Sequence, residues 1–223
     1  MSGDPSTRRR RRGGGKHRVR HHVNPLSFRR EVTIPDWAEV FAHPARPLEV
    51  DVGFAHGTFL LEQAARAPEH NFVGLEIRVP MVEEVRERIA ARGLTNVCAV
   101  LCNANQSFRD LFRPGSLHRV YVHFPDPWFK KKHHKRRLVN QAFLDDLAVC
   151  LSPAGELRFM TDYEVYAREV VELVEAHPAF ENVAGPGQPA PFEEGRVLSL
   201  REEWHLSQGD PVHRYHWRRR TGP

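Results

Sequence analysis

Between Leu48 and Ala176 the chain alternates short apolar runs with longer amphipathic segments, a pattern that few architectures accommodate. The apolar runs predict five strands, over Leu48–Gly53, Asn71–Ile77, Asn96–Cys102, His118–Phe124 and Gly155–Met160. The segments between and after them predict helices over Thr58–Arg66, Pro80–Arg92, Leu138–Leu151 and Tyr163–Ala176. Pro80 at a helix start and Gly93 just past its end are typical of helix boundaries. This βαβαβ order predicts an α/β fold with a mostly parallel, doubly wound sheet.

The C-terminal part reads differently. Residues 184–191 are rich in Gly and Pro and predict a loop, and Arg196–Leu200 and Val212–Trp217 predict a pair of closing antiparallel strands. At 223 residues the chain suits one domain, which we place at residues 25–223, preceded by a tail over residues 1–24.

Basic charge is concentrated in two places. Residues 1–22 carry eight Lys and Arg against one Asp, whereas the formal net charge of the whole chain is +5. A second basic block runs from Lys130 to Arg137. Such clusters indicate a polyanionic partner. The tail has almost no apolar content and is predicted to be disordered alone. It is interpreted either as a solubilising segment or as an arm attracted to RNA phosphates, and less readily as a nuclear-import signal.

The cysteines and the hydropathy exclude several classes. Cys98, Cys102 and Cys150 form no C-x-x-C pair, which disfavours a zinc ribbon or a thioredoxin-type site, and no metal is expected. Cys98 and Cys102 lie in an apolar stretch and are expected to be buried thiols. No apolar run is long enough to span a membrane, and no secretory segment follows the start, so a cytoplasmic protein is expected.

Polar residues follow the first three predicted strands. Asp51, Gly53 and Gly57 accompany the first strand, Glu76 ends the second, and Asn103 and Ala104 follow the third. Ligands of open parallel sheets bind beyond the carboxyl ends of the strands, where these residues would meet. The incomplete glycine pattern and the missing phosphate-binding Lys disfavour a dinucleotide or a nucleoside triphosphate. Each residue alone could simply cap a helix. Together they favour an adenosyl-sulfonium cofactor, with Glu76 on the ribose hydroxyls, Asn103 on the adenine and Asp51 facing the ammonium group.

The fourth predicted strand runs directly into the most specific segment, F-P-D-P-W-F-K-K-K-H-H-K-R-R, from Phe124 to Arg137. Pro125 and Pro127 fix φ on either side of Asp126 and so stiffen the turn that carries Asp126 and Trp128. A carboxylate, an aromatic ring and a basic block in succession suit an enzyme that takes one base from an RNA. The alternative is a Pro-rich turn followed by a solvated basic helix start.

This segment resembles the signature of the tRNA (guanine-N7-)-methyltransferases, F-P-D-P-W-x-K-x-x-H-x-K-R-R. The resemblance extends from about Pro47 to Trp217 and includes L-E-V-D-V-G-F, N-F-V-G-L-E-I, M-T-D-Y at 160–163 and a segment from Ser199. It implies a Rossmann-like class I methyltransferase that uses S-adenosylmethionine and acts on tRNA, usually at guanine 46 of the variable loop. It further implies cofactor contacts at Asp51, Glu76, Asn103 and Asp126, and guanine contacts at Lys130, Asp162, Ser199, Leu200, Arg201 and Glu202.

The sequence departs from the family pattern at four positions. Ala55 stands where a glycine is usual and is expected to be tolerated unless its φ is positive. His56 beside it is interpreted as incidental. Leu200 and Arg201 replace the usual Lys or Glu and aromatic residue, which leaves the guanine contacts and the target nucleotide open.

The chemistry implied by the resemblance needs no strong base, because N7 of guanine carries a free lone pair. We expect Asp126 to be the catalytic residue, stabilising the positive charge that the base gains, and Asp162 to hold the base edge. Two other functions stay open: an RNA-binding protein of this fold without turnover, and a methyltransferase for a small molecule or a protein. No protein partner is required by the sequence, and the oligomeric state is not fixed by it.

Overall fold

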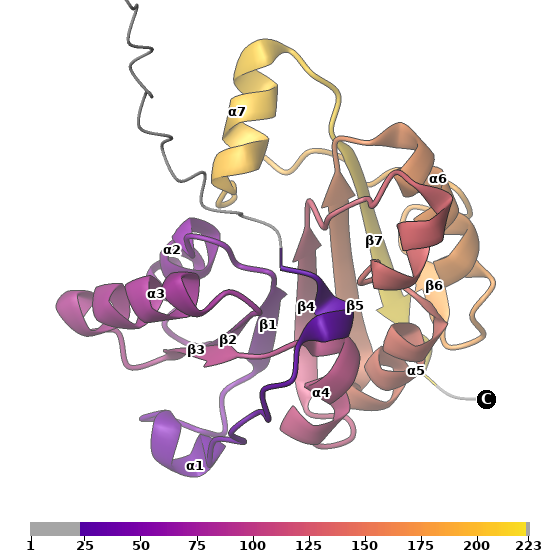
Figure 1. Cartoon of the computed structure of the whole chain (residues 1–223). Coiled ribbons are helices and arrows are strands. Elements are labelled where there is room, and N and C mark those ends of the chain that lie inside the picture. Colours follow the sequence, from indigo (N-terminus) through magenta and orange to yellow (C-terminus); the bar gives the residue numbers. More distant parts are fainter. Residues whose placement is uncertain (1–22, 222–223) are drawn as a thin grey trace, which may run out of the picture.

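The computed structural model describes residues 23–221, which form one open sheet flanked by helices (Figure 1). The strands are β1 Leu48–Val52, β2 Asn71–Glu76, β3 Val97–Leu101, β4 Leu117–His123, β5 Leu151–Thr161, β6 Phe180–Asn182 and β7 His213–Arg219. The α-helices are α1 Trp37–Val40, α2 Thr58–Arg66, α3 Val79–Arg92, α4 Ala104–Leu111, α5 Gln141–Cys150, α6 Glu164–Glu175 and α7 Leu200–Gln208. Two 3-10 helices, η1 Pro25–Ser27 and η2 Lys131–Arg136, complete the set.

The strand order is β3-β2-β1-β4-β5-β7-β6. Strands β1 to β5 run parallel to one another, whereas β7 runs antiparallel to both β5 and β6. This arrangement confirms the predicted α/β fold with a mostly parallel sheet and antiparallel closing strands. The chain moves outward from β1 through β3 and then returns to β4 on the other side of β1. The order therefore reverses between β1 and β4, and ligands of open α/β sheets bind at such a switch point.

Alternate residues of β2 show how the two faces of the sheet are covered. Phe72 packs in a cluster with side chains of α2 and α3, whereas Val73 and Leu75 pack in a larger cluster with side chains of α4, α5 and α6. Gly74 points to the α2 side, where an added Cβ would lie 2.4 Å from a methyl group of Leu60 and 2.5 Å from the Phe54 ring. Glycine at this position lets α2 approach the sheet closely. The start of α2 is thereby held beside the carboxyl end of β1.

Of the two predicted closing strands, Val212–Trp217 is confirmed as β7 and the other is wrong. Arg196–Leu200 is not a strand: Ser199 caps α7 by accepting a hydrogen bond from the backbone N–H of Glu202, and the helix begins at Leu200. The short strand β6, which was not predicted, occupies the sheet edge and pairs with β7 instead. The helix expected from Leu138 begins only at Gln141, because Asn140 caps it through the N–H of Phe143.

Residues 1–22 of the predicted tail lie outside the described residues. Of the remaining tail residues, Asn24 caps η1 and Val23 lines the cavity described below. Cys102 is buried as expected, whereas Cys98 is only partly buried. Within residues 23–221, every helix is too short or too polar to cross a bilayer.

Candidate active site

A cavity of about 450 Å³ opens at the carboxyl edge of the parallel strands, the edge above which α7 stands in Figure 1. This volume lies within the range of small-molecule sites. Ten of the predicted site residues line it: Asp51, Gly53, Gly57, Glu76, Asn103, Ala104, Asp126, Ser199, Leu200 and Arg201. They come from the ends of β1 to β4 and the start of α7, so the topology gathers segments that are far apart in the sequence. Lys130, Asp162 and Glu202 are not among the lining residues.

The loop between β1 and α2 forms one wall of the cavity and is built on left-handed backbone. Gly53 has a φ of 83° and Gly57 a φ of 66°, and a Cβ on Gly57 would lie 2.6 Å from Val85. Alanine was expected to be tolerated at position 55 unless its φ is positive. Ala55 has a φ of 51°, so this condition is not met. An L-residue in this region is strained by roughly 1–2 kcal/mol. The loop nevertheless keeps its shape, because the Ala55 N–H donates to the Glu76 carboxylate at 3.1 Å.

Glu76 is buried at the end of β2 and is firmly held. Its carboxylate accepts hydrogen bonds from the backbone N–H groups of Ile77 and Arg78 as well as that of Ala55. The Arg78 guanidinium adds two more, from Nε at 3.0 Å and Nη2 at 2.8 Å. This pairing with Glu76 raises the pKa of Arg78. Arg78 lines the cavity but was not predicted, since nothing in the sequence marks an Arg two residues after a strand end as a partner of its carboxylate.

Asp51, at the end of β1, is a buried carboxylate of a different kind. Only 4% of it is exposed, and within residues 23–221 no group donates a hydrogen bond to its side chain. Burial, and then the neighbouring Glu76, raise the pKa of Asp51 to about 7. The carboxylate is therefore costly to ionise in the free protein, and a cationic group in the cavity would favour the ionised form.

Asn103 is engaged by the protein itself. Its side-chain oxygen caps α4 through the N–H of Asn105, and its amide donates to the Pro25 carbonyl at 2.9 Å. Pro25 belongs to η1, which also lines the cavity. The amide predicted to contact an adenine thus ties the N-terminal segment of the described chain to the cavity wall.

The turn after β4 carries Asp126 on strained backbone. Phe124 and Trp128, on either side of the Pro-Asp-Pro sequence, have φ values of 49° and 45°. Such strain typically amounts to about 1–3 kcal/mol per residue and is concentrated at functional sites. Phe124 is held by a 2.8 Å hydrogen bond from its N–H to the Met160 carbonyl. The Trp128 ring lines the cavity, with the Arg136 guanidinium 4.9 Å from its centroid.

The residues predicted to hold the guanine divide into two groups. Asp162 lies near the cavity mouth, where Arg201 contacts it at 3.0 Å and His205 at 3.3 Å. Glu202 is fully buried and forms ion pairs with Arg196 and Arg214. In the free protein this side chain fastens α7 to the start of β7, and its second carboxylate oxygen has no hydrogen-bond partner among the described residues.

The basic block is only partly available for binding. Lys130, Lys131, Lys132 and Lys135 are exposed on or beside η2. Arg137 is 8% exposed and turns inward, donating to the Pro127 carbonyl at 2.7 Å and to Glu169, with its guanidinium over the Tyr166 ring. The last arginine of the block therefore holds the Pro-Asp-Pro turn to α6.

Several solved structures with this fold are methyltransferases. A 16S rRNA (adenine(1408)-N(1))-methyltransferase from Catenulisporales acidiphilia aligns with a TM-score of 0.62 at 19% identity, over 87% of this chain and 95% of that one. The aminoglycoside resistance methyltransferase NpmB1 aligns with a TM-score of 0.56 at 18% identity, over 85% and 94% of the two chains. Identities this low concern the fold alone. The fold is therefore the Rossmann-like fold of class I S-adenosylmethionine-dependent methyltransferases, with the cavity at its switch point.

The sequence comparisons narrow this class to one family. Residues 45–215 match the family described as "Putative methyltransferase". A protein of Synechococcus sp. (strain JA-3-3Ab) is 41% identical, over 91% of this chain and 86% of its own length, and is named tRNA (guanine-N(7)-)-methyltransferase. A protein of Thermosynechococcus vestitus with the same name is 40% identical, over 91% of this chain and 95% of its own length. The chain belongs to the tRNA (guanine-N(7)-)-methyltransferase family.

Proposed function

We propose that this enzyme transfers a methyl group from S-adenosylmethionine to N7 of a guanine in tRNA, and that the target is guanine 46 of the variable loop. The observation that carries the proposal is the position of Asp126. It lines the cofactor-sized cavity and stands four residues before Lys130, where the exposed lysines begin. The relatives' name supports the chemistry and the class of RNA. The choice of guanine 46 rests on the resemblance of the signature segment.

The cavity fits the cofactor's functional groups. Asp51 offers a buried carboxylate that no described group neutralises, which suits the ammonium group of the methionine part. Glu76 presents carboxylate oxygens for the ribose hydroxyls, and its backbone and Arg78 hydrogen bonds keep it in one orientation. Bound there, S-adenosylmethionine would supply an electrophilic methyl group on a positively charged sulfur.

The work of the protein is positioning and charge stabilisation. N7 attacks with its own lone pair, so no residue has to remove a proton from it. Asp126 faces the base as it gains positive charge and stabilises that charge, which a preorganised carboxylate does well in a partly dry site. Holding the base in line with the methyl group can contribute roughly 7–11 kcal/mol in favourable systems.

Asp162 reaches the N1 and N2 edge of the guanine once Arg201 releases it. In the free protein Arg201 is paired with Asp162 and lies over the Phe124 ring, 5.5 Å from its centroid. Guanine offers two N–H donors in the place of the guanidinium, so one set of charge-assisted hydrogen bonds replaces another. This exchange makes Arg201 a residue that closes the empty guanine site.

The tRNA backbone follows the exposed lysines, and apolar rings flank them. Phe129 is 69% exposed beside the block and Trp204 is 56% exposed on α7. Phosphate contacts with lysines and stacking of unpaired bases on exposed rings are the usual elements of RNA binding. The site needs neither a metal nor a partner chain for this chemistry, and a tRNA substrate agrees with a cytoplasmic enzyme.

The decisive experiment is a methylation assay with radiolabelled S-adenosylmethionine and unmodified tRNA transcripts, followed by borohydride–aniline cleavage to map N7-methylguanine. We expect cleavage at position 46 with the wild type and with Asp145→Asn, which changes an exposed carboxylate on α5. Asp126→Asn should lower turnover at least about 100-fold while tRNA affinity stays within about threefold.

Each other outcome points elsewhere. Cleavage at another guanine would keep the chemistry and refute the choice of position 46. Cofactor and tRNA binding without methyl transfer would favour an RNA-binding protein of this fold, and wild-type turnover by Asp126→Asn would refute the role of Asp126.

A further inference from the structure

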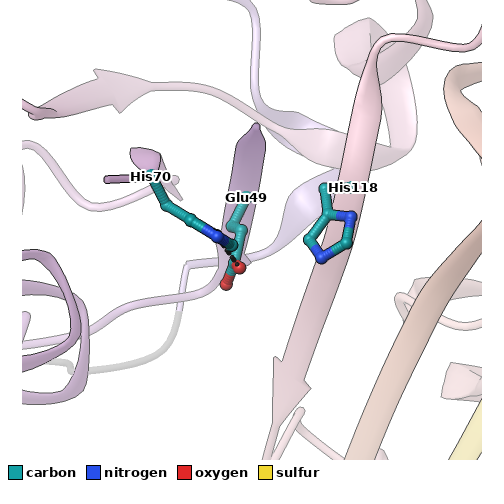
Figure 2. Close-up of side chains that lie close together, drawn as sticks. All are labelled: Glu49, His70 and His118. Carbon is teal, nitrogen blue, oxygen red and sulfur yellow. Dashed lines mark hydrogen bonds and ion pairs between the residues drawn. The ribbon is translucent and has the colours of Figure 1, made fainter. Parts of the chain in front are cut away.

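A second group of chemically active side chains lies at the opposite edge of the sheet. Glu49 is at the start of β1, His70 immediately precedes β2, and His118 is at the start of β4 (Figure 2). One ligand atom from each residue can be chosen so that all three lie within 4.8 Å of one another. No other group of three His, Cys, Asp or Glu side chains among the described residues lies this close together. It belongs to neither the cofactor cavity nor the basic block.

The approach between the three residues is close. His70 Nδ1 lies 2.6 Å from Glu49 Oε1, and the His70 and His118 rings meet edge to face with centroids 5.4 Å apart. Figure 2 shows the two imidazoles on either side of the carboxylate. His118 makes no hydrogen bond with the described part of the chain, so neither of its ring nitrogens is engaged by a described residue.

Glu49 is held as metal-binding carboxylates usually are. It is 1% exposed, and its second oxygen accepts a 2.7 Å hydrogen bond from the Tyr121 hydroxyl. Arg119 contacts the first oxygen at 3.2 Å, but its charge is shared with Glu156, to which it donates at 2.9 Å. Outer hydrogen bonds of this kind fix the orientation of a ligand before the metal arrives.

A purely structural explanation covers only part of this arrangement. Arg119 and the His70 hydrogen bond together neutralise and satisfy the buried Glu49. Neither interaction involves His118, which stands beside the pair with its ring nitrogens unused by the described residues. Two imidazoles and one carboxylate are the ligand set that binds Zn²⁺ in sites with an open fourth position. Softer, thiol-preferring ions and hard, oxygen-preferring ions fit this set less well.

We propose that Glu49, His70 and His118 form a zinc site, with solvent as the fourth ligand. Zinc–ligand bonds of about 2.0–2.1 Å place tetrahedral ligands roughly 3.3 Å apart. The ion would thus take the place of the proton between His70 and Glu49, and His118 would move inward by about an ångström. The site joins the amino ends of β1 and β4 to the turn before β2, so it stabilises the sheet and takes no part in methyl transfer. It is independent of the proposed function.

The test uses the full chain, stripped with chelator, and titrates it with ZnCl₂ while calorimetry and thermal unfolding are followed. Histidines elsewhere in the chain also attract zinc, so the comparison is between variants. His118→Ala removes one ligand and leaves the Glu49–Arg119–Tyr121 contacts in place. His177→Ala is the matched control, because His177 is also paired with a carboxylate, Asp145 at 3.1 Å, but no third ligand accompanies them.

We expect the wild type and His177→Ala to bind one zinc ion more than His118→Ala does. At a free zinc concentration about 100-fold above the dissociation constant, the midpoint of unfolding should rise by roughly 5–10 °C for these two proteins only. His70→Ala should behave like His118→Ala. With Co²⁺ in place of zinc, the wild type should show the visible absorption of a four-coordinate ion, and His70→Ala and His118→Ala should not. Equal zinc stoichiometry and equal stabilisation in the wild type and His118→Ala would overturn the proposal, as would a wild type that zinc does not stabilise.

Discussion

Replacing Asp51 by asparagine should remove a pH dependence from cofactor binding. In the free protein the Asp51 carboxyl is buried and has a pKa of about 7. It is therefore ionised in about half of the molecules at pH 7 and in about one tenth at pH 6. A bound ammonium group favours the ionised form, so binding expels the proton. We expect about 0.9 proton to be released per cofactor bound at pH 6, where the amino group of the cofactor is already protonated.

The affinity follows from the same numbers. If the ionised form is the one that binds, the dissociation constant at pH 6 is about fivefold higher than at pH 7. Asp51→Asn cannot ionise, so its affinity should be weaker than that of the wild type at pH 7 and should lose this step. For the wild type, binding tightens as pH rises from 6 to 7, and above that the cofactor's amino group, which loses its proton near pH 8, opposes further gain.

Calorimetry with S-adenosylhomocysteine and S-adenosylmethionine measures both quantities, because titrations in buffers of different ionisation enthalpy give the number of protons released. Asp145→Asn, on α5 and outside the cavity, should keep the wild-type profile. His56→Gln, which changes another cavity residue, identifies any contribution from that imidazole. Proton release at pH 6 that persists in Asp51→Asn would refute the reasoning, as would equal wild-type affinity at pH 6 and pH 7.

The remaining predictions concern stability and RNA binding. Because the pKa of Asp51 is raised from 3.8 to about 7, the unliganded wild type should lose stability relative to Asp51→Asn as pH rises from 3.8 to 7. In urea unfolding the variant should be more stable by about 2 kcal/mol at pH 5 and by about 4 kcal/mol at pH 7. Ala55→Gly relieves the positive φ and should raise the free energy of unfolding by up to about 1 kcal/mol. Ala64→Gly, in α2, should lower the free energy of unfolding. If both variants lost the same stability, the backbone at Ala55 would not be strained. Arg137→Ala should lower the free energy of unfolding by about 2–3 kcal/mol. Lys131→Ala should leave the free energy of unfolding unchanged within about 0.5 kcal/mol but reduce the salt dependence of tRNA binding by about one phosphate contact. If Lys131→Ala lowered stability and Arg137→Ala lowered the salt dependence, the buried role of Arg137 and the RNA-binding role of Lys131 would be refuted.

Much of the fold could be predicted because its strands are short apolar runs with turns on both sides. Asn71–Ile77 is an example, since the run matches β2 within one residue. The convergence of Asp51, Glu76 and Asn103 on one cavity also followed, because the carboxyl ends of parallel strands meet at one edge. These predictions needed the order of the elements and no knowledge of individual contacts.

The errors arose where a local pattern competes with tertiary structure. The alternation in Arg196–Leu200 favoured a strand, but a Ser followed three residues later by a Glu is also the pattern of a helix start, and the structure follows the second. The ion pairs of Glu202 were also not foreseen, because Arg196 and Arg214 approach it from different parts of the chain. Such pairings depend on packing at long range, so the sequence could not show which charges of the segment are buried.

The hydrogen bond between Asn103 and Pro25 has a practical consequence for anyone who handles this enzyme. The segment that it holds lines the cofactor cavity and leads directly to the N-terminal residues, the usual place for an affinity tag. A tag, a fluorophore or a fusion partner attached directly before Val23 would sit at a wall of the cavity and should change cofactor affinity. A C-terminal label, beyond β7 and three strands away from β1 in the sheet, is the better choice for quantitative work on a shortened chain.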